Sequence, residues 1–180
     1  THIFTRLGLW QESIAMNRRS ADAALQHPVD GKISLHYLHA LDYLAYAYLQ
    51  CGQDQQALQV LDEMAALQGP FQTHVASAYT FAAVPARIAL ERQQWEQAAQ
   101  LQASTPSGYA WENNPAMAAI TYFANGLGAA RLGDSTAAGR AIQALTQLQA
   151  QAEQQSAYWG KQVEIQRLSV EAWQAYGEGG

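Results

Sequence analysis

Three side chains that could bind a metal or transfer protons, His36, His39 and Asp42, stand three residues apart in one segment. Residues three apart on a helix share one broad face, so we expect His39 to hydrogen-bond Asp42 one turn further on, with His36 at the surface. A metal site on a helix usually uses His at i and i+4 and needs three or four converging ligands. His2 is the one further histidine placed to approach, from a neighbouring hairpin. We therefore predict no metal site within this segment by itself.

The sequence offers little for nucleophilic catalysis. It contains no Gly-x-Ser-x-Gly elbow, and its single cysteine, Cys51, has no histidine near it in the sequence. The stretch from Gly126 to Gly128 resembles half of a nucleotide-binding loop, but no strand precedes it, and it indicates a close helix crossing instead. We predict a protein that is not an enzyme and that uses no cofactor. The alternative is a histidine-bearing metal or catalytic site completed by residues upstream of the chain.

The composition is that of an acidic, helix-forming chain. It has 180 residues and a formal charge of −5, and helix formers such as alanine and glutamine outnumber strand formers. A phosphate backbone would require a basic face, so we expect no nucleic-acid partner, single-stranded RNA included. No run approaches the roughly 20 apolar residues of a membrane span, and we expect no membrane association.

The two ends of the sequence suggest a fragment. The chain starts at Thr1 without a methionine, and turn signals lie close to both ends, at Gly8 and Gly179. We expect a piece of a longer cytoplasmic protein, with residues 1–180 forming a single domain. Apolar helix faces exposed at such ends tend to associate with other molecules. Self-association through the ends is therefore an open alternative.

Apolar residues recur with a period of 3.6, which predicts helices along the whole chain. Pro85 lies inside one of them, where we expect a kink near Phe81 rather than a break, because the apolar period continues on both sides. The predicted helices run from Trp10 to a stop at His27-Pro28, over 33–51, from an Asp54 cap to Leu67, and over 73–91, 95–103, 116–132, 136–154 and 157–176.

Small residues stand at two fixed distances from the predicted turns. The turns are placed at Gly8, Gly52, Gln93, Gly133 and Gly179. Seven residues before the last four stand Ala45, Ala86, Gly126 and Ala172, and five residues after the first four stand Ser13, Ala57, Ala98 and Ala138. Small side chains on both arms of a hairpin let its helices approach closely. Hairpins repeated every 40 to 46 residues are typical of an α-solenoid.

The order of large, small, aromatic, glycine and alanine residues resembles the tetratricopeptide repeat (TPR). It is carried by Leu44-Ala45, Tyr48, Gly52 and Ala57, by Gly126, Ala129, Gly133 and Ala138, by Ala86, Ala89, Trp95 and Ala98, and in halves by Gly8, Trp10 and Ser13 and by Leu168, Ala172, Ala175 and Gly179. The repeats exceed the usual length of about 34 residues, and Pro85 is a further departure. The resemblance implies an all-α solenoid, a right-handed superhelix of about four antiparallel hairpins and a half repeat.

Two strings, residues 2–10 and 38–50, are also similar to a group of longer bacterial TPR proteins, which carry more helical, histidine-bearing sequence upstream. In the TPR family the first helix of each hairpin lines a concave groove. The resemblance therefore implies groove positions at His39, Asp42, Tyr46, Gln50, Arg87, Glu91, Phe123, Leu127, Arg131, Ser169 and Trp173.

Aromatic rings beside isolated arginines suit an extended peptide, since rings supply contact area and arginine pairs bidentately with a carboxylate. We therefore predict a scaffold that binds a protein or peptide segment in this groove. The alternative for Tyr46 and Phe123 is packing between adjacent repeats. A lysine and asparagine clamp for chaperone tails is not expected, because the groove positions contain no lysine and Asn125 falls on the packing side.

Overall fold

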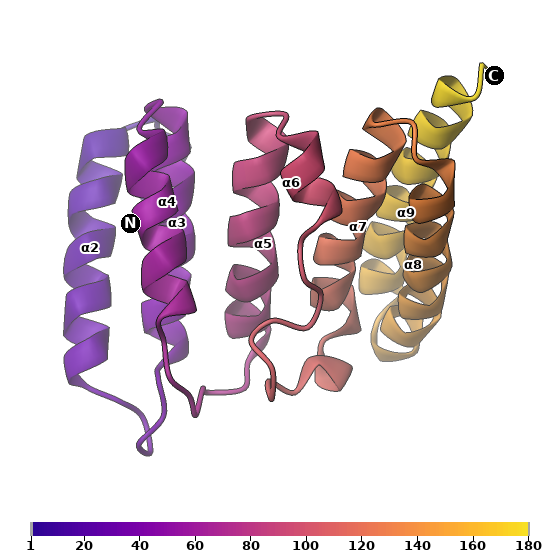
Figure 1. Cartoon of the computed structure of the whole chain (residues 1–180). Coiled ribbons are helices and arrows are strands. Elements are labelled where there is room, and N and C mark those ends of the chain that lie inside the picture. Colours follow the sequence, from indigo (N-terminus) through magenta and orange to yellow (C-terminus); the bar gives the residue numbers. More distant parts are fainter. Residues whose placement is uncertain (1, 180) are drawn as a thin grey trace. The chain divides into compact units, whose positions relative to one another are not determined.

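The computed structural model describes residues 2–179, and within them the chain is all helical (Figure 1). Its elements are α1 (His2–Arg6), α2 (Trp10–Gln26), α3 (Leu35–Gln50), α4 (Asp54–Ala65), α5 (Val75–Glu91), α6 (Trp95–Ala99), a 3-10 helix η1 (Trp111–Asn113), α7 (Pro115–Arg131), α8 (Ser135–Gln155) and α9 (Ala157–Gly177). Strand-type pairing in that range is limited to two isolated bridges, Val29 with Lys32 and Ile33 with Phe71. None of these helices combines the length and apolar character needed to cross a bilayer. The predicted all-α class is confirmed.

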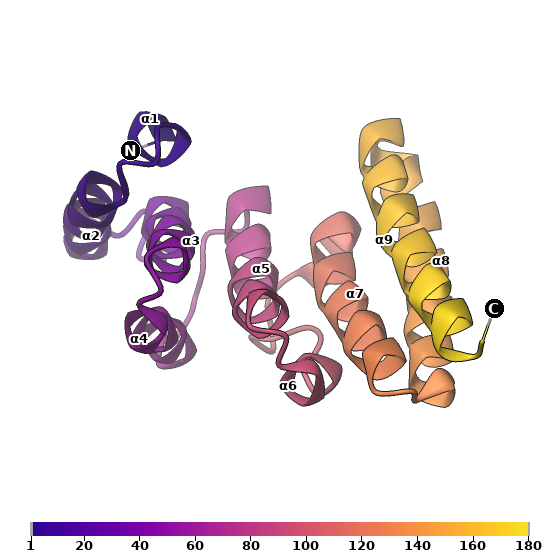
Figure 2. The same cartoon turned by 90° about the horizontal axis from the view of Figure 1, so that it is seen from above.

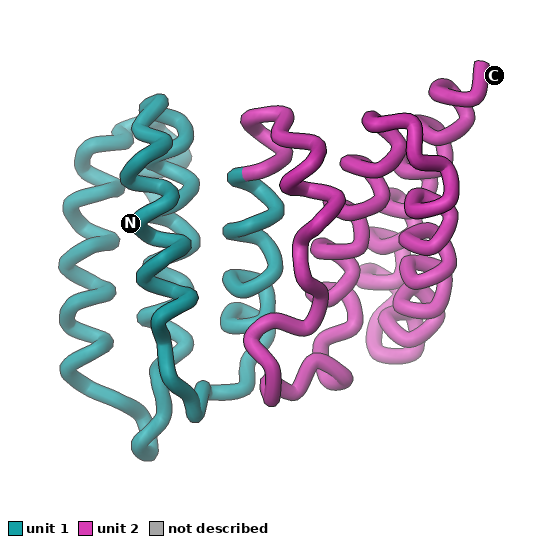
Figure 3. The backbone as a smooth tube through the Cα atoms, in the orientation of Figure 1, with its two compact units in different colours: residues 1–88 teal, residues 89–180 magenta. Residues whose placement is uncertain are grey.

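The chain divides into two compact units, and the boundary falls inside α5 (Figure 3). Unit 1 comprises residues 1–88 and unit 2 residues 89–180. In unit 1, α3 packs against α2 and α4, and its leucines Leu38, Leu41 and Leu44 are fully buried. In unit 2, α7, α8 and α9 pack against one another (Figure 2), around Leu145 and Val170. Each fully buried side chain of this size stabilises its unit by about 1.5–3 kcal/mol.

The predicted turns share one backbone geometry. All five turn residues have positive φ: Gly8 at 70°, Gly52 at 67°, Gln93 at 54°, Gly133 at 76° and Gly179 at 85°. At the first four turns the amide one residue later donates to the carbonyl five residues before it, in the pairs Leu9 to Phe4, Gln53 to Tyr48, Gln94 to Ala89 and Asp134 to Ala129. This is the bonding of a Schellman motif, which ends a helix on a left-handed residue. The placement of the turns from sequence is confirmed.

Seven of the eight small residues that flank these turns are buried, and the eighth, Ala172, is exposed. Ser13, Ala45, Ala57, Ala86, Ala98 and Ala138 have at most 2% of their surface exposed, and Gly126 is buried with them. A Cβ at Gly126 would lie 2.7 Å from a methyl carbon of Val170 on α9. A Cβ at Gly128 would lie 2.6 Å from the backbone of Trp95 and of Ala99 on α6. The interpretation of Gly126 and Gly128 as a close crossing, rather than a phosphate loop, is confirmed.

Four predicted helix bounds were wrong by two residues or more, among them the end of α4, at Ala65 rather than Leu67, and the start of α5, at Val75 rather than residue 73. The helix expected over 33–51 begins at Leu35, because Ile33 pairs its backbone with the segment at Phe71, accepting from the amide of Gln72 and donating to the carbonyl of Pro70, each at 2.9 Å. The helix expected over 95–103 ends at Ala99.

The early end of α6 is fixed by Asn125 of α7. Its side-chain amide donates to the carbonyls of Ala98 and Leu101, at 2.9 and 3.0 Å, and so satisfies acceptors that further helix would have used. The expectation that Asn125 faces the packing side is thereby confirmed.

The predictions made for the helix cap at Asp54 and for Pro85 can be compared with the structure. Asp134 caps α8, its carboxylate accepting from the amide of Ala137 at 2.9 Å. Asp54 is instead the first residue of α4, and Gln53 takes the N-cap position. The helix α5 runs through Pro85 without a break.

The glycine crossings allow a paired test of packing. Replacing Gly128 by alanine forces a Cβ against the backbone of α6, so the free energy of unfolding should fall by about 1–3 kcal/mol. The matched control is Gly139→Ala in α8, where a Cβ meets nothing within 4 Å; helix propensity should there raise it by up to about 1 kcal/mol. Urea unfolding of both variants measures the difference, and equal values would contradict the close-crossing account.

Candidate functional site

The first polar cluster of unit 1 is a pair of histidines from two helices. His2 of α1 and His39 of α3 place their Nε2 atoms 3.1 Å apart. The His2 ring stacks on Tyr43, with centroids 4.8 Å apart and planes 8° apart, and the His39 ring meets the same tyrosine edge-on at 5.0 Å. The approach of His2 from the neighbouring hairpin is confirmed. We call His2 and His39 the histidine pair.

The prediction that His39 hydrogen-bonds to Asp42 is wrong. The carboxylate of Asp42 accepts instead from Nη1 of Arg87 on α5, at 2.7 Å. A guanidinium is a stronger partner for a carboxylate than a neutral imidazole, and Asp42, only 7% exposed, is turned toward α5. His36 lies exposed, as expected.

Arg87 is held inside unit 1 by several groups at once. Besides Asp42, its Nη2 donates to the hydroxyl of Tyr79 at 3.2 Å, and its guanidinium lies 5.3 Å from the centroid of the Tyr46 ring. The side chains of Arg87 and Asp42 are only 17% and 9% exposed. Burial would lower the pKa of Arg87, but the charge and hydrogen bond of Asp42 outweigh it and leave that pKa above its ordinary value. This pair joins α3 to α5.

Tyr46 takes part in packing rather than in an open surface. It is half-buried, and besides Arg87 its ring meets Trp10 of α2 edge-on, with centroids 5.7 Å apart. The packing alternative for Tyr46 therefore describes its contacts better than the groove alternative. Gln50, at the end of α3, is exposed.

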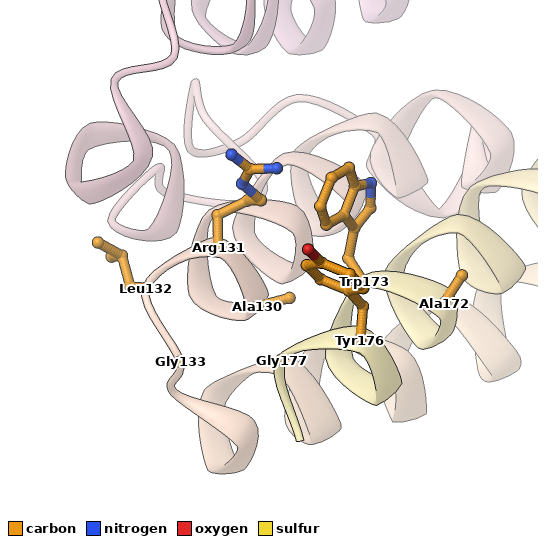
Figure 4. Close-up of a pocket in the computed structure, with 8 residues that line it drawn as sticks. All are labelled: Ala130, Arg131, Leu132, Gly133, Ala172, Trp173, Tyr176 and Gly177. Atoms are coloured by element: carbon orange, nitrogen blue, oxygen red, sulfur yellow. The ribbon is translucent and has the colours of Figure 1, made fainter. Parts of the chain in front are cut away.

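Unit 2 contains a pocket where α7 and α9 end (Figure 4). It has a volume of about 670 Å³ and is lined by Ala130, Arg131, Leu132, Gly133, Ala172, Trp173, Tyr176 and Gly177. Figure 4 shows Trp173 and Tyr176 of α9 facing Arg131 of α7. Trp173 is 38% and Tyr176 72% exposed, so both rings are available to an incoming group. We call this site the Arg131 pocket.

The guanidinium of Arg131 is held by aromatic rings alone. Its Cζ lies 4.2 Å from the ring centroid of Trp173 and 4.9 Å from that of Trp95. Within residues 2–179 no carboxylate or hydrogen-bond acceptor pairs with it. Stacking occupies the faces of a guanidinium and leaves its N–H edges for a carboxylate. Arg131 and Arg87, both predicted groove residues, therefore occupy different chemical situations.

The remaining predicted site residues are spread along α5, α7 and α9 in unit 2. Phe123 and Leu127 are half-buried, and Glu91 is exposed. The hydroxyl of half-buried Ser169 donates within its own helix, to the carbonyl of Ile165 at 2.7 Å. The predicted set thus divides between the units, with His39, Asp42, Tyr46, Gln50 and Arg87 in unit 1 and Glu91, Phe123, Leu127, Arg131, Ser169 and Trp173 in unit 2.

Sequence reasoning missed four aromatic contacts. Three of them had a signal in helical spacing: Tyr43 stands four residues after His39, Tyr79 eight before Arg87, and Tyr176 three after Trp173, all on shared helix faces. Nothing in the sequence marked Trp95, because its contact with Arg131 depends on how α6 lies against α7.

Comparison with known proteins identifies no site in this chain, and the arrangement of its acidic and histidine side chains does not form a metal site of three or more ligands in the described residues. No protein-family model, curated protein or solved structure matches the chain. In the part of the chain that the structure describes, no three side chains of His, Cys, Asp or Glu are grouped to hold a metal ion. The chemistry that the geometry offers is therefore that of the histidine pair and of the Arg131 pocket.

The ion pair inside unit 1 leads to a stability prediction. Asp42→Ala leaves Arg87 buried without its counter-charge and should lower the free energy of unfolding by about 3–5 kcal/mol. Replacing both partners, Asp42→Leu with Arg87→Met, should restore most of that loss because no uncompensated charge remains. Denaturant unfolding measures both variants.

The control is Lys161→Ala, which removes an ion pair whose lysine is 66% exposed; it should leave the unfolding midpoint in place, since surface pairs contribute little. A loss in Asp42→Ala no larger than that of the control would refute the structural role of the pair.

Proposed function

We propose that this chain is a non-catalytic interaction module of the TPR type, a right-handed superhelix of about four hairpins and a half, that binds a protein or peptide segment. The fold class and the repeated hairpin turns support the proposal. The observation that carries it is the Arg131 pocket, where a guanidinium without an acidic partner in the described residues lies 4.9 and 4.2 Å from the centroids of two indole rings. Such an arrangement keeps an arginine in place without consuming its hydrogen-bonding capacity.

The pocket's composition points to the chemistry of the partner. Its lining is mostly apolar and aromatic, with Arg131 as the one charged side chain among its lining residues. An acidic side chain or a terminal carboxylate beside an apolar residue would fill it, pairing with the guanidinium edge and packing on Trp173 and Tyr176. Because two rings already orient Arg131, little side-chain entropy would remain to be lost when the partner binds.

The contacts in unit 1 change which predicted groove residues we assign to the partner. Asp42 and Arg87 are paired and largely buried, and Tyr46 packs against Trp10 and Arg87, so these three stabilise unit 1 in our proposal. Arg131 and Trp173 carry the recognition. Replacement of Arg87 would then weaken binding only by destabilising the protein, whereas replacement of Arg131 would weaken binding in a folded chain.

The proposal is tested with peptides selected from a random library displayed with free carboxyl termini. Peptides bound by the intact chain should lose affinity about tenfold or more in Arg131→Gln, because a hydrogen-bonded charge contributes about 1.5–3 kcal/mol. Arg131→Lys should retain part of the affinity as a point charge without the planar fork. Isothermal titration calorimetry measures each constant.

The matched control is Arg140→Gln, an exposed arginine in the same unit that lies outside the pocket. It should bind the selected peptides within about twofold of the parent chain. Circular dichroism should show both glutamine variants folded at the assay temperature, with Arg131→Gln melting slightly lower because it loses two cation–π contacts. Equal affinities for the Arg131 and Arg140 variants, or a library that yields no binder, would contradict the proposal.

A further inference from the structure

The histidine pair joins two helices that are distant in the sequence, and peptide recognition in the other unit does not use it. The two Nε2 atoms face each other at 3.1 Å across 37 residues of chain. At that distance one ring donates its Nε2 proton and the other accepts it with its lone pair. Neither imidazole has another hydrogen bond in the described part of the chain.

The distance between the two nitrogens suits a shared metal ion. Imidazole nitrogens lie about 2.0–2.1 Å from zinc in tetrahedral sites, which puts two such ligands about 3.3–3.4 Å apart. The pair in the metal-free protein is therefore only a few tenths of an ångström tighter than the coordinated arrangement would be. Coordination would also turn both rings so that each Nε2 lone pair points at the shared ion rather than at the other ring.

We propose that His2 and His39 form a transition-metal site in which an imidazole-preferring divalent ion, of the Zn²⁺ or Cu²⁺ class, bridges their two Nε2 atoms. The pair supplies two ligands, and water or an added small molecule completes the coordination. Imidazole is the side chain that suits zinc, copper and nickel alike. The proton that links the rings leaves Nε2, and the donor ring stays neutral by taking a proton at Nδ1.

Burial favours the neutral form of His39 that a metal needs. Burial lowers the pKa of His39; the charge of Asp42 opposes this, while His2, His36 and His74 add to it. Because protons and metal compete for the same nitrogens, affinity should fall as the pH drops through the imidazole pKa range.

Ring packing fixes the orientation of the pair. Tyr43 stacks against His2 and meets His39 edge-on, which holds the two rings in the arrangement that brings their Nε2 atoms together. Asp42, the nearest carboxylate in sequence, is already bound to Arg87 and is not counted as a ligand. The site is therefore open, with two protein ligands and free coordination positions.

The bridge would tie α1 to α3. None of the five residues of α1 is buried, and a metal bridge at its first residue would add to the contacts that hold this helix, among them the stacking of His2 on Tyr43. An ion that binds only the folded form stabilises that form by mass action. This role is separate from the Arg131 pocket, which lies in the other unit.

The test uses ZnCl₂ and CuCl₂ titrated calorimetrically into the intact chain in a non-coordinating buffer at neutral pH. We expect one site per chain, weakened about tenfold or more in His2→Ala and in His39→Ala, because each variant removes one of two ligands. The matched control is His36→Ala, an exposed histidine on the same helix, which should leave the affinity within about twofold. Since His2 is itself exposed, His2→Ala decides the matter even if His39→Ala unfolds.

Electron paramagnetic resonance of the copper-loaded chain measures the number of nitrogen ligands, which does not depend on the stability of the fold. The parent chain should show coupling to two imidazole nitrogens, and His2→Ala coupling to one. Failure to bind either ion more tightly than about 1 mM, or an equal loss of affinity in His36→Ala and His2→Ala, would overturn the inference. Neither result would bear on peptide binding, which is measured with different variants.

Discussion

Helices of unit 2 come into close contact at two glycines of α7, where a side chain is missing. Gly126 meets Val170 on α9 and Gly128 meets the backbone of α6, at distances that leave no room for a Cβ. Because interiors are packed to crystal density, these contacts fix which helices are neighbours. The contacts of Arg131 with Trp95 and Trp173 follow from that arrangement, since the two rings come from different helices, α6 and α9.

The two arginines that the resemblance placed in a groove show how context divides one residue type into two roles. Arg87 meets a carboxylate, a hydroxyl and a ring from its own unit, so its charge is satisfied internally. Arg131 meets only rings, so its charge is oriented but not neutralised by the described chain. A protein that stabilises itself through one and presents the other can lose binding without losing its fold.

The sequence was sufficient for features set by local geometry and insufficient for those set by partners across helices. The left-handed turns at Gly52 and Gly133 were predictable because glycine adopts positive φ without penalty, and the buried alanines followed from their fixed spacing. The short α6 was not predictable, because it ends where Asn125, 24 residues beyond Leu101, donates to its carbonyls. The partner of Asp42 was missed for the same reason: a nearby histidine was assigned to it, and an arginine 45 residues away took its place.

The two tryptophans that contact Arg131 can serve as intrinsic fluorescence probes of its pocket. The chain has five tryptophans. Two of them, Trp95 and Trp173, contact the guanidinium of Arg131. Indole emission responds to the local electric field, so an anion arriving at that guanidinium would alter the light from these two rings while the other three serve as a constant background. Occupancy of the pocket can then be followed in unlabelled protein, by its own fluorescence.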